Sequence, residues 1–284
     1  MPPAAAIPTG TAKGYLYYRH TLPVRVMHWI NVVALTILLM SGLGIFNSHA
    51  KLYWWGKSSY TGAPPILEIH GLEGASGELK GVTRVFGHEF DTTGVLGASR
   101  NRDGDVVRRG FPWWATIPDN QWLSMARSWH FFFAWLFVLN GLAYVFYSAA
   151  SRHLARDLAP DRSDWRSIGR SIRDHVRFRH PTGEAAKRYN VLQKLAYLAV
   201  IFVLLPLIIL MGLAMSPWAD AVWPGWVDLF GGRQAARTIH FVVAWLLVGF
   251  MLIHVFEVVV SGLWNHLRSM ITGRYRVKVE ASHE

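Results

Sequence analysis

The chain has 284 residues, of which 52% are hydrophobic and 14% aromatic, and its formal net charge is +11. This composition and a positive mean hydropathy predict a membrane protein rather than a soluble domain. There is no cysteine, which excludes disulfides, thiolate-bound iron-sulfur clusters and covalently attached c-type haem.

Four apolar runs are each long enough to cross a bilayer as a helix. No charged segment followed by an apolar core opens the chain, so we expect no cleaved signal peptide and a first run that remains as an anchor. We predict an all-α integral membrane protein, a four-helix transmembrane bundle with a long outer-side loop between helices 1 and 2. The expected segments are an arm 1–23, spans 24–46, 129–149, 195–215 and 239–260, connections 47–128, 150–194 and 216–238, and a tail 261–284.

Flanking charge predicts the orientation of the spans. Residues 151–194 hold 11 Lys/Arg against 5 Asp/Glu, and the arm and tail are also basic. The positive-inside rule places these three segments, and with them both termini, in the cytoplasm. The alternative interpretation of the basic loop is that it binds nucleic acid. Membrane topology and binding to anionic lipid already explain its charge, so no nucleic-acid partner is expected.

The connection 47–128 is expected on the outer side and is far longer than an ordinary loop, which is typical of a functional segment. Within it, residues 82–111 read as short strands joined at glycine-rich turns, including Asp103-Gly104. The aromatic stretch 111–129 then reads as an interfacial segment leading into the second span.

Four histidines fall within or at the ends of the spans. His240 and His254 are 14 positions apart, roughly 21 Å along a helix, and they leave it within about 40° of one direction. With the predicted topology, His28 shares the inner depth of His254, and His130 shares the outer depth of His240. Two pairs at matched depths are what two bis-histidine haems in a helical bundle require. Each histidine alone could instead be an interhelical hydrogen-bonding residue.

Three arginines precede proposed ligands by three residues, one turn closer to water: Arg25, Arg127 and Arg237. A guanidinium suits the propionates that haem carries to the aqueous boundary, although basic residues also snorkel from any membrane helix. Glycines in the spans could admit a flat macrocycle or serve helix packing: Gly42, Gly44, Gly141 and Gly212.

The remaining histidines lie in tails or loops. Eight of them are expected to be solvated: His20, His49, His70, His88, His153, His175, His180 and His283. His266 follows the fourth span and could cap it at the interface or lie near a quinone.

The motifs RVMHW and RTIHF, together with the 14-residue histidine spacing, resemble the bacterial di-haem cytochrome b561-type subunits of nickel-iron hydrogenase and formate dehydrogenase. FPWWATIP, ARSWHFFFAWLFVLNGLAY, LQKLAYL and GGRQAARTIHF look closer to the thiosulfate-reductase-like cytochrome b branch. The resemblance implies two haem b groups, bound by His28 with His254 and by His130 with His240. It also implies electron transfer between quinone and a periplasmic redox enzyme, such as a molybdopterin-dependent one.

The same resemblance implies a cytoplasmic quinone site around an asparagine before the third helix. Asn190 and Gln193 occupy that position here, and helix capping is their alternative role. Glu257, one turn beyond His254, could take up quinol protons or snorkel to the interface.

The interpretation that follows is an electron-transfer subunit of an oxidoreductase with lipid, quinone and a redox enzyme as partners. One rival is a self-sufficient b561-type oxidoreductase that acts on a small molecule. A second rival is a transporter or proton channel in which the histidines form a relay. The direction of electron flow is not encoded in these patterns.

Overall fold

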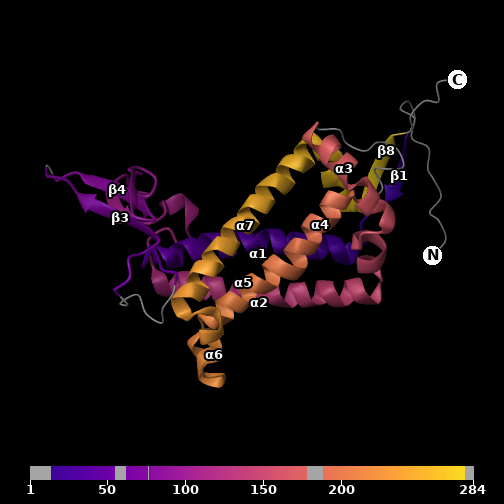
Figure 1. Ribbon diagram of the computed structural model, residues 1–284. Coiled ribbons are helices and arrows are strands. Elements are labelled where there is room, and N and C mark those ends of the chain that lie inside the picture. The colour runs from indigo at the N-terminus through magenta and orange to yellow at the C-terminus, as the bar shows by residue number, and fades with distance from the viewer. Residues whose placement is uncertain (1–13, 55–61, 76, 178–187, 279–284) are drawn as a thin grey trace. The chain divides into compact units, whose positions relative to one another are not determined.

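The computed structural model describes residues 14–54, 62–75, 77–177 and 188–278. Four helices in it are long and apolar enough to cross a membrane (Figure 1), so the four expected membrane helices are confirmed. They are α1 (Leu22–Phe46), α2 (Leu123–Ala150), the composite of α4 (Val191–Ala199), η4 (Val200–Leu204) and α5 (Leu205–Ala214), and α7 (Arg233–Val260).

The third membrane helix changes its winding in the middle. Its central segment η4 is a π-helix that ends just before Pro206. Proline has no N–H to donate to the carbonyl one turn earlier, and a π-turn is a common way for a helix to absorb such an irregularity. The membrane helix therefore continues through Pro206 instead of ending there.

The chain forms two compact units. The first contains Met1–Ile30, Asn140–Leu205 and Leu246–Glu284, and the second contains Asn31–Leu139 and Pro206–Trp245. Each of the four long helices contributes a segment to both units. Each unit is described separately below.

Strands are present in addition to helices, which corrects the all-α prediction. The second unit holds a four-stranded antiparallel sheet, in the order β2-β3-β4-β5, and the pair β6-β7. These strands are β2 (Lys51–Leu52), β3 (Leu67–Glu73), β4 (Leu79–Val85), β5 (His88–Asp91), β6 (Gly97–Arg100) and β7 (Val106–Arg109). Phe86 and Gly87 join β4 to β5 with φ values of 47° and 86°, as a two-residue hairpin turn with two positive φ angles requires.

The core of the second unit joins the strands to the end of α1. Leu43 and Phe46 of α1 pack with Leu52, Ile69 and Phe111, all of them buried. Glu68 of β3 is also buried and pairs with Lys51 at 2.6 Å and with Arg84 at 3.0 Å. A second cluster packs α5 against the start of α7 through Met211, Ala214, Val227 and Ala236. Short helices η1 (Trp113–Ala115), α6 (Pro217–Val222) and η5 (Trp226–Phe230) complete this unit.

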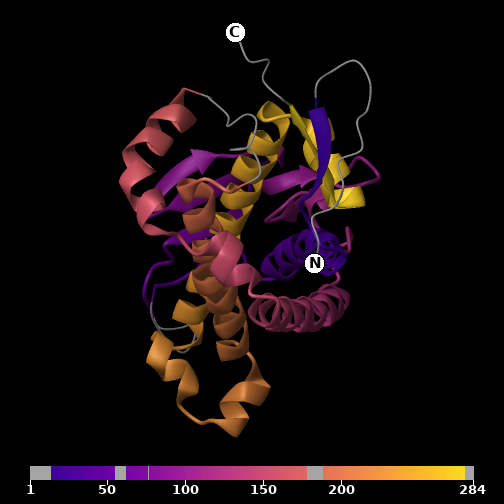
Figure 2. The ribbon, with the colours of Figure 1, turned by 90° about the vertical axis from the view of Figure 1, so that its right-hand side faces the viewer.

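A separate two-stranded sheet in the first unit joins segments from opposite ends of the chain. β1 (Gly14–Tyr18) pairs antiparallel with β8 (Arg274–Lys278), in the register Tyr18↔Arg274, and the two strands lie side by side in Figure 2. Helix α8 (Leu263–Thr272) leads into β8 through Gly273, where φ is 81° and a Cβ would meet the Tyr18 ring at 2.6 Å. This turn therefore requires glycine.

Between α2 and α4, the first unit also contains η2 (Leu154–Leu158) and α3 (Arg162–Val176). The rest of the predicted basic loop, residues 178–187, lies outside the described residues, as do residues 1–13 of the arm, 55–61 and 76 of the long connection, and 279–284 of the tail.

Candidate functional site

Two histidine pairs form, one in each unit. In the first unit, His28 of α1 faces His254 of α7, with ring centres 6.4 Å apart and an interplanar angle of 63°. In the second unit, His130 of α2 faces His240 of α7, with ring centres 6.3 Å apart and an angle of 63°. We call these the first pair and the second pair. The pairing matches the one predicted from histidine depth.

The spacing of both pairs suits one metal ion between the two rings. An imidazole nitrogen lies about 2.0–2.1 Å from a bound transition metal and about 1.1 Å from its own ring centre, so two rings that share a metal have centres about 6.3 Å apart. Direct van der Waals stacking would bring the centres closer, as in the Phe46–Phe241 stack at 4.8 Å. The side chains present therefore fit bis-histidine ligation of haem iron.

Hydrogen bonds fix the tautomer of the second pair. His240 Nδ1 lies 2.9 Å from the Ile208 carbonyl, which can only accept, so Nδ1 carries the proton. His130 Nδ1 lies 3.1 Å from Ser41 Oγ, whose own proton is donated to the Ile37 carbonyl at 2.6 Å. Ser41 therefore accepts from Nδ1 of His130. Both rings keep a bare Nε2, the arrangement that metal-binding histidines use.

Aromatic rings surround the first pair. Phe250, one turn before His254, stacks on its ring at 5.9 Å and 19°, and Tyr197 of α4 meets the same ring edge-on at 6.5 Å. Trp29 lies against His28 at 5.6 Å and donates Nε1 to the Met270 carbonyl at 3.1 Å. These rings provide apolar walls.

The three predicted arginines already contact protein groups. Arg25 donates to the Ile271 carbonyl, yet its Nε is buried without a partner among the described residues. Arg127 lies 5.6 Å from the Phe131 ring centre. Arg237 donates to the His49 carbonyl and lies 5.3 Å from the Phe46 ring centre. A guanidinium has five N–H donors, so these contacts leave donors for a propionate.

The four predicted glycines have different surroundings. A Cβ on Gly42 would lie 3.4 Å from His130 Cε1, and a Cβ on Gly212 would lie 3.5 Å from His240 Cε1. These two glycines therefore give space to the rings of the second pair. Gly44 packs instead against the Ile117 carbonyl, which a Cβ would meet at 2.9 Å, and a Cβ on Gly141 would meet nothing within 4 Å.

The predicted quinone residues lie in the first unit. Asn190 and Gln193 form a capping box at the start of α4: Asn190 Oδ1 accepts from Gln193 N at 2.9 Å, and Gln193 Oε1 accepts from Asn190 N at 3.2 Å. Their alternative role as helix caps is thus confirmed. Glu257 is half-buried on α7. His266 Nε2 lies 3.0 Å from Ser261 Oγ, just after the end of α7, and its ring is edge-on to Tyr275.

The expectation that the histidines in tails and loops are solvated is wrong for three of them. His49 Nε2 and His70 Nδ1 are buried without a hydrogen-bond partner among the described residues. Burial lowers the pKa of His20 to about 3, and the nearby Arg19 charge adds to the effect. All three lie outside the membrane helices, and a position in a tail or loop does not by itself reveal burial by other segments. His180 and His283 lie outside the described residues.

Sequence reasoning missed the groups that orient the rings. Ser41 and the Ile208 carbonyl bind the second pair, and Asn140 donates to the carbonyl of Met27, the residue before His28, at 2.9 Å. Buried serine and asparagine inside apolar spans were the available signals, since such groups need partners in a membrane.

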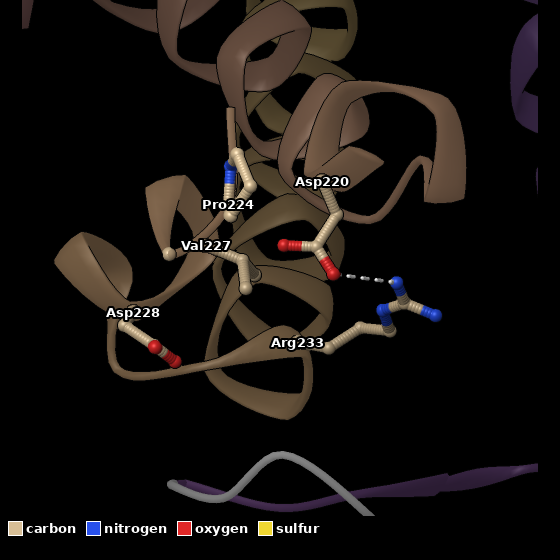
Figure 3. Close-up of a pocket in the computed structure, with 6 residues that line it drawn as sticks. Asp220, Pro224, Val227, Asp228 and Arg233 are labelled. Atoms are coloured by element: carbon tan, nitrogen blue, oxygen red, sulfur yellow. Dashed lines mark ion pairs between the residues drawn. The ribbon is translucent and has the colours of Figure 1, made fainter. Parts of the chain in front are cut away.

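A surface pocket in the second unit lies at the junction of α6, η5 and α7 (Figure 3). It is lined by Asp220, Pro224, Gly225, Val227, Asp228 and Arg233. Arg233 pairs there with Asp220 at 3.7 Å. None of its lining residues belongs to a histidine pair, so the pocket is not the redox site.

Comparisons with known proteins agree with this geometry. The profile described as prokaryotic cytochrome b561 matches residues 105–273. The chain is 34% identical to the putative protein-methionine-sulfoxide reductase subunit YedZ1 of Azospira oryzae, over 84% of this chain and 89% of the relative. It is 21% identical to the probable Ni/Fe-hydrogenase B-type cytochrome subunit of Cupriavidus necator, over 90% of this chain and 85% of the relative.

No solved structure matches the chain significantly. The relatives are subunits of redox enzymes, and the b561 profile implies haem b in a bacterial membrane. The profile covers more than half of the chain. This chain is therefore a haem b electron-transfer protein that belongs to the prokaryotic cytochrome b561 family.

Proposed function

We propose that the chain binds two haem b groups and passes electrons across the inner membrane between quinone and a periplasmic oxidoreductase. The observation that carries this proposal is the occurrence of two histidine pairs with the same spacing and angle, one in each unit. The first pair would hold the inner haem and the second pair the outer haem, with both termini in the cytoplasm. Arg25, Arg127 and Arg237 would meet the propionates.

A bound haem would supply iron that changes its oxidation state by one electron. The protein holds the rings in place. Ser41 and the Ile208 carbonyl keep the Nδ1 protons of the second pair, which directs both Nε2 lone pairs into the space between the rings. Phe250, Tyr197 and Trp29 line the first pair with aromatic rings.

Pyridine haemochrome quantification with reduced-minus-oxidised spectra tests this directly. We expect two b haems per purified wild-type chain and one in each of His254→Ala and His130→Ala. His88→Ala, a histidine in the exposed strand β5, is the matched control and should retain two. One haem in the wild type, or loss of both haems in each single variant, would contradict separate sites.

Quinone would bind near the first pair, on the cytoplasmic side of the membrane. Glu257 lies one turn beyond His254, and the Asn190–Gln193 capping box begins α4, whose Tyr197 contacts His254. We expect Glu257→Gln to slow haem reduction by a quinol while haem content stays at the wild-type value. Stopped-flow spectroscopy measures this rate, and an unchanged rate would remove Glu257 from the quinone site.

The partner enzyme would dock on the outer side. The Azospira oryzae relative is named as a subunit of a putative protein-methionine-sulfoxide reductase, so methionine sulfoxide is the first partner substrate to test. The rival, a self-sufficient oxidoreductase, predicts turnover of a small molecule by the purified chain alone. We expect turnover only after a partner enzyme is added. Tolerance of all four histidines to substitution would instead favour a transporter or channel.

A further inference from the structure

The amphipathic helix α3 is held against one end of a membrane helix. It lies between two consecutive membrane helices, because α2 ends at Ala150 and α4 begins at Val191. Asp164 of α3 pairs with Lys194, in the first turns of α4, at 2.7 Å, and both side chains are largely buried. In Figures 1 and 2, α3 lies close to the end of α4 at which this ion pair forms. This ion pair fixes α3 at one end of a membrane helix.

One stripe of α3 faces the protein. Its half-buried positions recur at i, i+3, i+4, i+7 and i+10, which is the spacing of one helical face. They are Asp164, Ser167, Ile168, Ser171 and Asp174. All of them except Ile168 are polar, so a mostly polar face of α3 is directed at the first unit, the reverse of a helix that covers an apolar core.

The opposite side of α3 combines exposed apolar and cationic side chains. Trp165 and Ile172 are 53% and 49% exposed and lie within about 20° of each other around the helix. Beside them runs a stripe of exposed arginines that spans about 80°: Arg162, Arg166, Arg170 and Arg173. Among the described residues, no carboxylate pairs with any of these four arginines.

We propose that this face of α3 is a binding site for anionic phospholipid headgroups. An aromatic and an aliphatic side chain at the surface of a bilayer enter the headgroup boundary, and neighbouring guanidinium groups form bidentate hydrogen bonds with phosphates. A soluble nucleic acid or acidic protein would match the arginines but leave Trp165 and Ile172 in water. A bilayer surface matches both sets, and the chain already meets it on either side of α3.

The absence of cysteine from the chain permits a clean test. Ile172→Cys carries a single environment-sensitive fluorophore, and the holoprotein is placed in nanodiscs of phosphatidylcholine alone or mixed with phosphatidylglycerol. We expect a blue-shifted emission and quenching by doxyl-labelled lipid, both several-fold stronger with phosphatidylglycerol. High salt should weaken the difference, because screening acts on exposed charges.

Two further variants separate charge from fold. Replacing the four arginines of the stripe with glutamine should abolish the phosphatidylglycerol dependence, and replacing them with lysine should retain most of it. Haem content and circular dichroism of both variants should equal those of the parent. A label that stays in water in every nanodisc would overturn the proposal, and so would equal quenching in neutral and anionic nanodiscs.

Discussion

The two histidine pairs share one geometry, but different forces hold their rings. In the second pair, both Nδ1 atoms are hydrogen-bonded, to Ser41 and to the Ile208 carbonyl, and glycines lie against both rings. In the first pair, Phe250, Tyr197 and Trp29 pack around the rings. Directional bonds fix the tautomer and the angle of a ring, whereas packing mainly limits its movement. The second pair should therefore respond more sharply to small substitutions.

The largest effect should follow from filling the glycine space of the second pair. Gly212→Leu adds a side chain beyond a Cβ that would already lie 3.5 Å from His240 Cε1. We expect loss of the haem at the second pair alone, giving one haem per chain by pyridine haemochrome. Gly169→Leu is the matched control, since a Cβ at this position on α3 meets nothing within 4 Å. Two haems in Gly212→Leu would show that the ring has room to move.

A smaller effect is expected from Ser41→Ala, which removes the acceptor for the Nδ1 proton of His130. Loss of such a partner typically weakens metal binding by about 10-fold or more. We expect faster haem loss to apomyoglobin from one of two sites, together with a shift in its midpoint potential. Thr36→Ala should change neither quantity, because that hydroxyl bonds only within α1, to Val32. Equal behaviour of the two variants would mean that Ser41 does not orient the ring.

The two units should lose stability at different pH values as the solution is acidified. Burial lowers the pKa of His20 in the first unit from 6.5 to about 3, so the unfolded state takes up the proton first. The stability that neutral His20 provides is complete above pH 6.5 and is lost as the pH falls toward about 3. In the second unit, burial alone would raise the pKa of Glu68, but the hydrogen bond and charge of Lys51 outweigh it and lower the pKa. The stability that charged Glu68 provides is complete above its usual pKa of 4.5 and is lost as the pH falls through the lowered pKa.

Pulsed hydrogen exchange after incubation at each pH measures this order. Protection in β1 and β8 should fall at a higher pH than protection in β3 and β4. His20→Leu should remove the early loss in the first unit and leave the second unit unchanged. Simultaneous loss of protection in both sheets would contradict a separate role for His20.

The smallest effect is expected at the first pair. Phe250→Leu removes the ring stacked on His254 but keeps an apolar side chain of similar reach. We expect two haems and a potential shift on the order of tens of millivolts in one of them. Phe146→Leu, at a position that is 77% exposed, should leave both potentials unchanged. Loss of a haem from Phe250→Leu would show that packing holds the first pair as strictly as hydrogen bonds hold the second.

The helices and the pairing of their histidines could be predicted because both follow from one-dimensional patterns. A run of apolar residues sets a helix, and the depth of His28, His130, His240 and His254 along such runs sets their partners. The strands β4 to β7 were also foreseen from glycine-rich turns. The bonds to Ser41 and Ile208 were not, because each partner lies on another helix, and the rotation of that helix depends on side-chain packing.

The β1-β8 sheet was missed for a related reason. Its two strands are short, and each takes its hydrogen bonds from a partner at the other end of the chain. The local sequence pattern of either strand does not show which strand it pairs with. Nor does it show the turn at Gly273 that leads α8 into β8. The capping box at Asn190 is the opposite case, since both of its members lie within four residues and could be read directly.

The β1-β8 sheet also has a consequence for biosynthesis. β1 is translated before α1 and β8 after α7, so the sheet can form only when β8 has left the ribosome. Until then the backbone N–H and C=O groups of β1 lack the partners that β8 provides, and they are hydrogen-bonded to water. Formation of the sheet is thus a late step of assembly, and it occurs only in chains in which insertion of all four membrane helices has brought both strands to the same side of the bilayer.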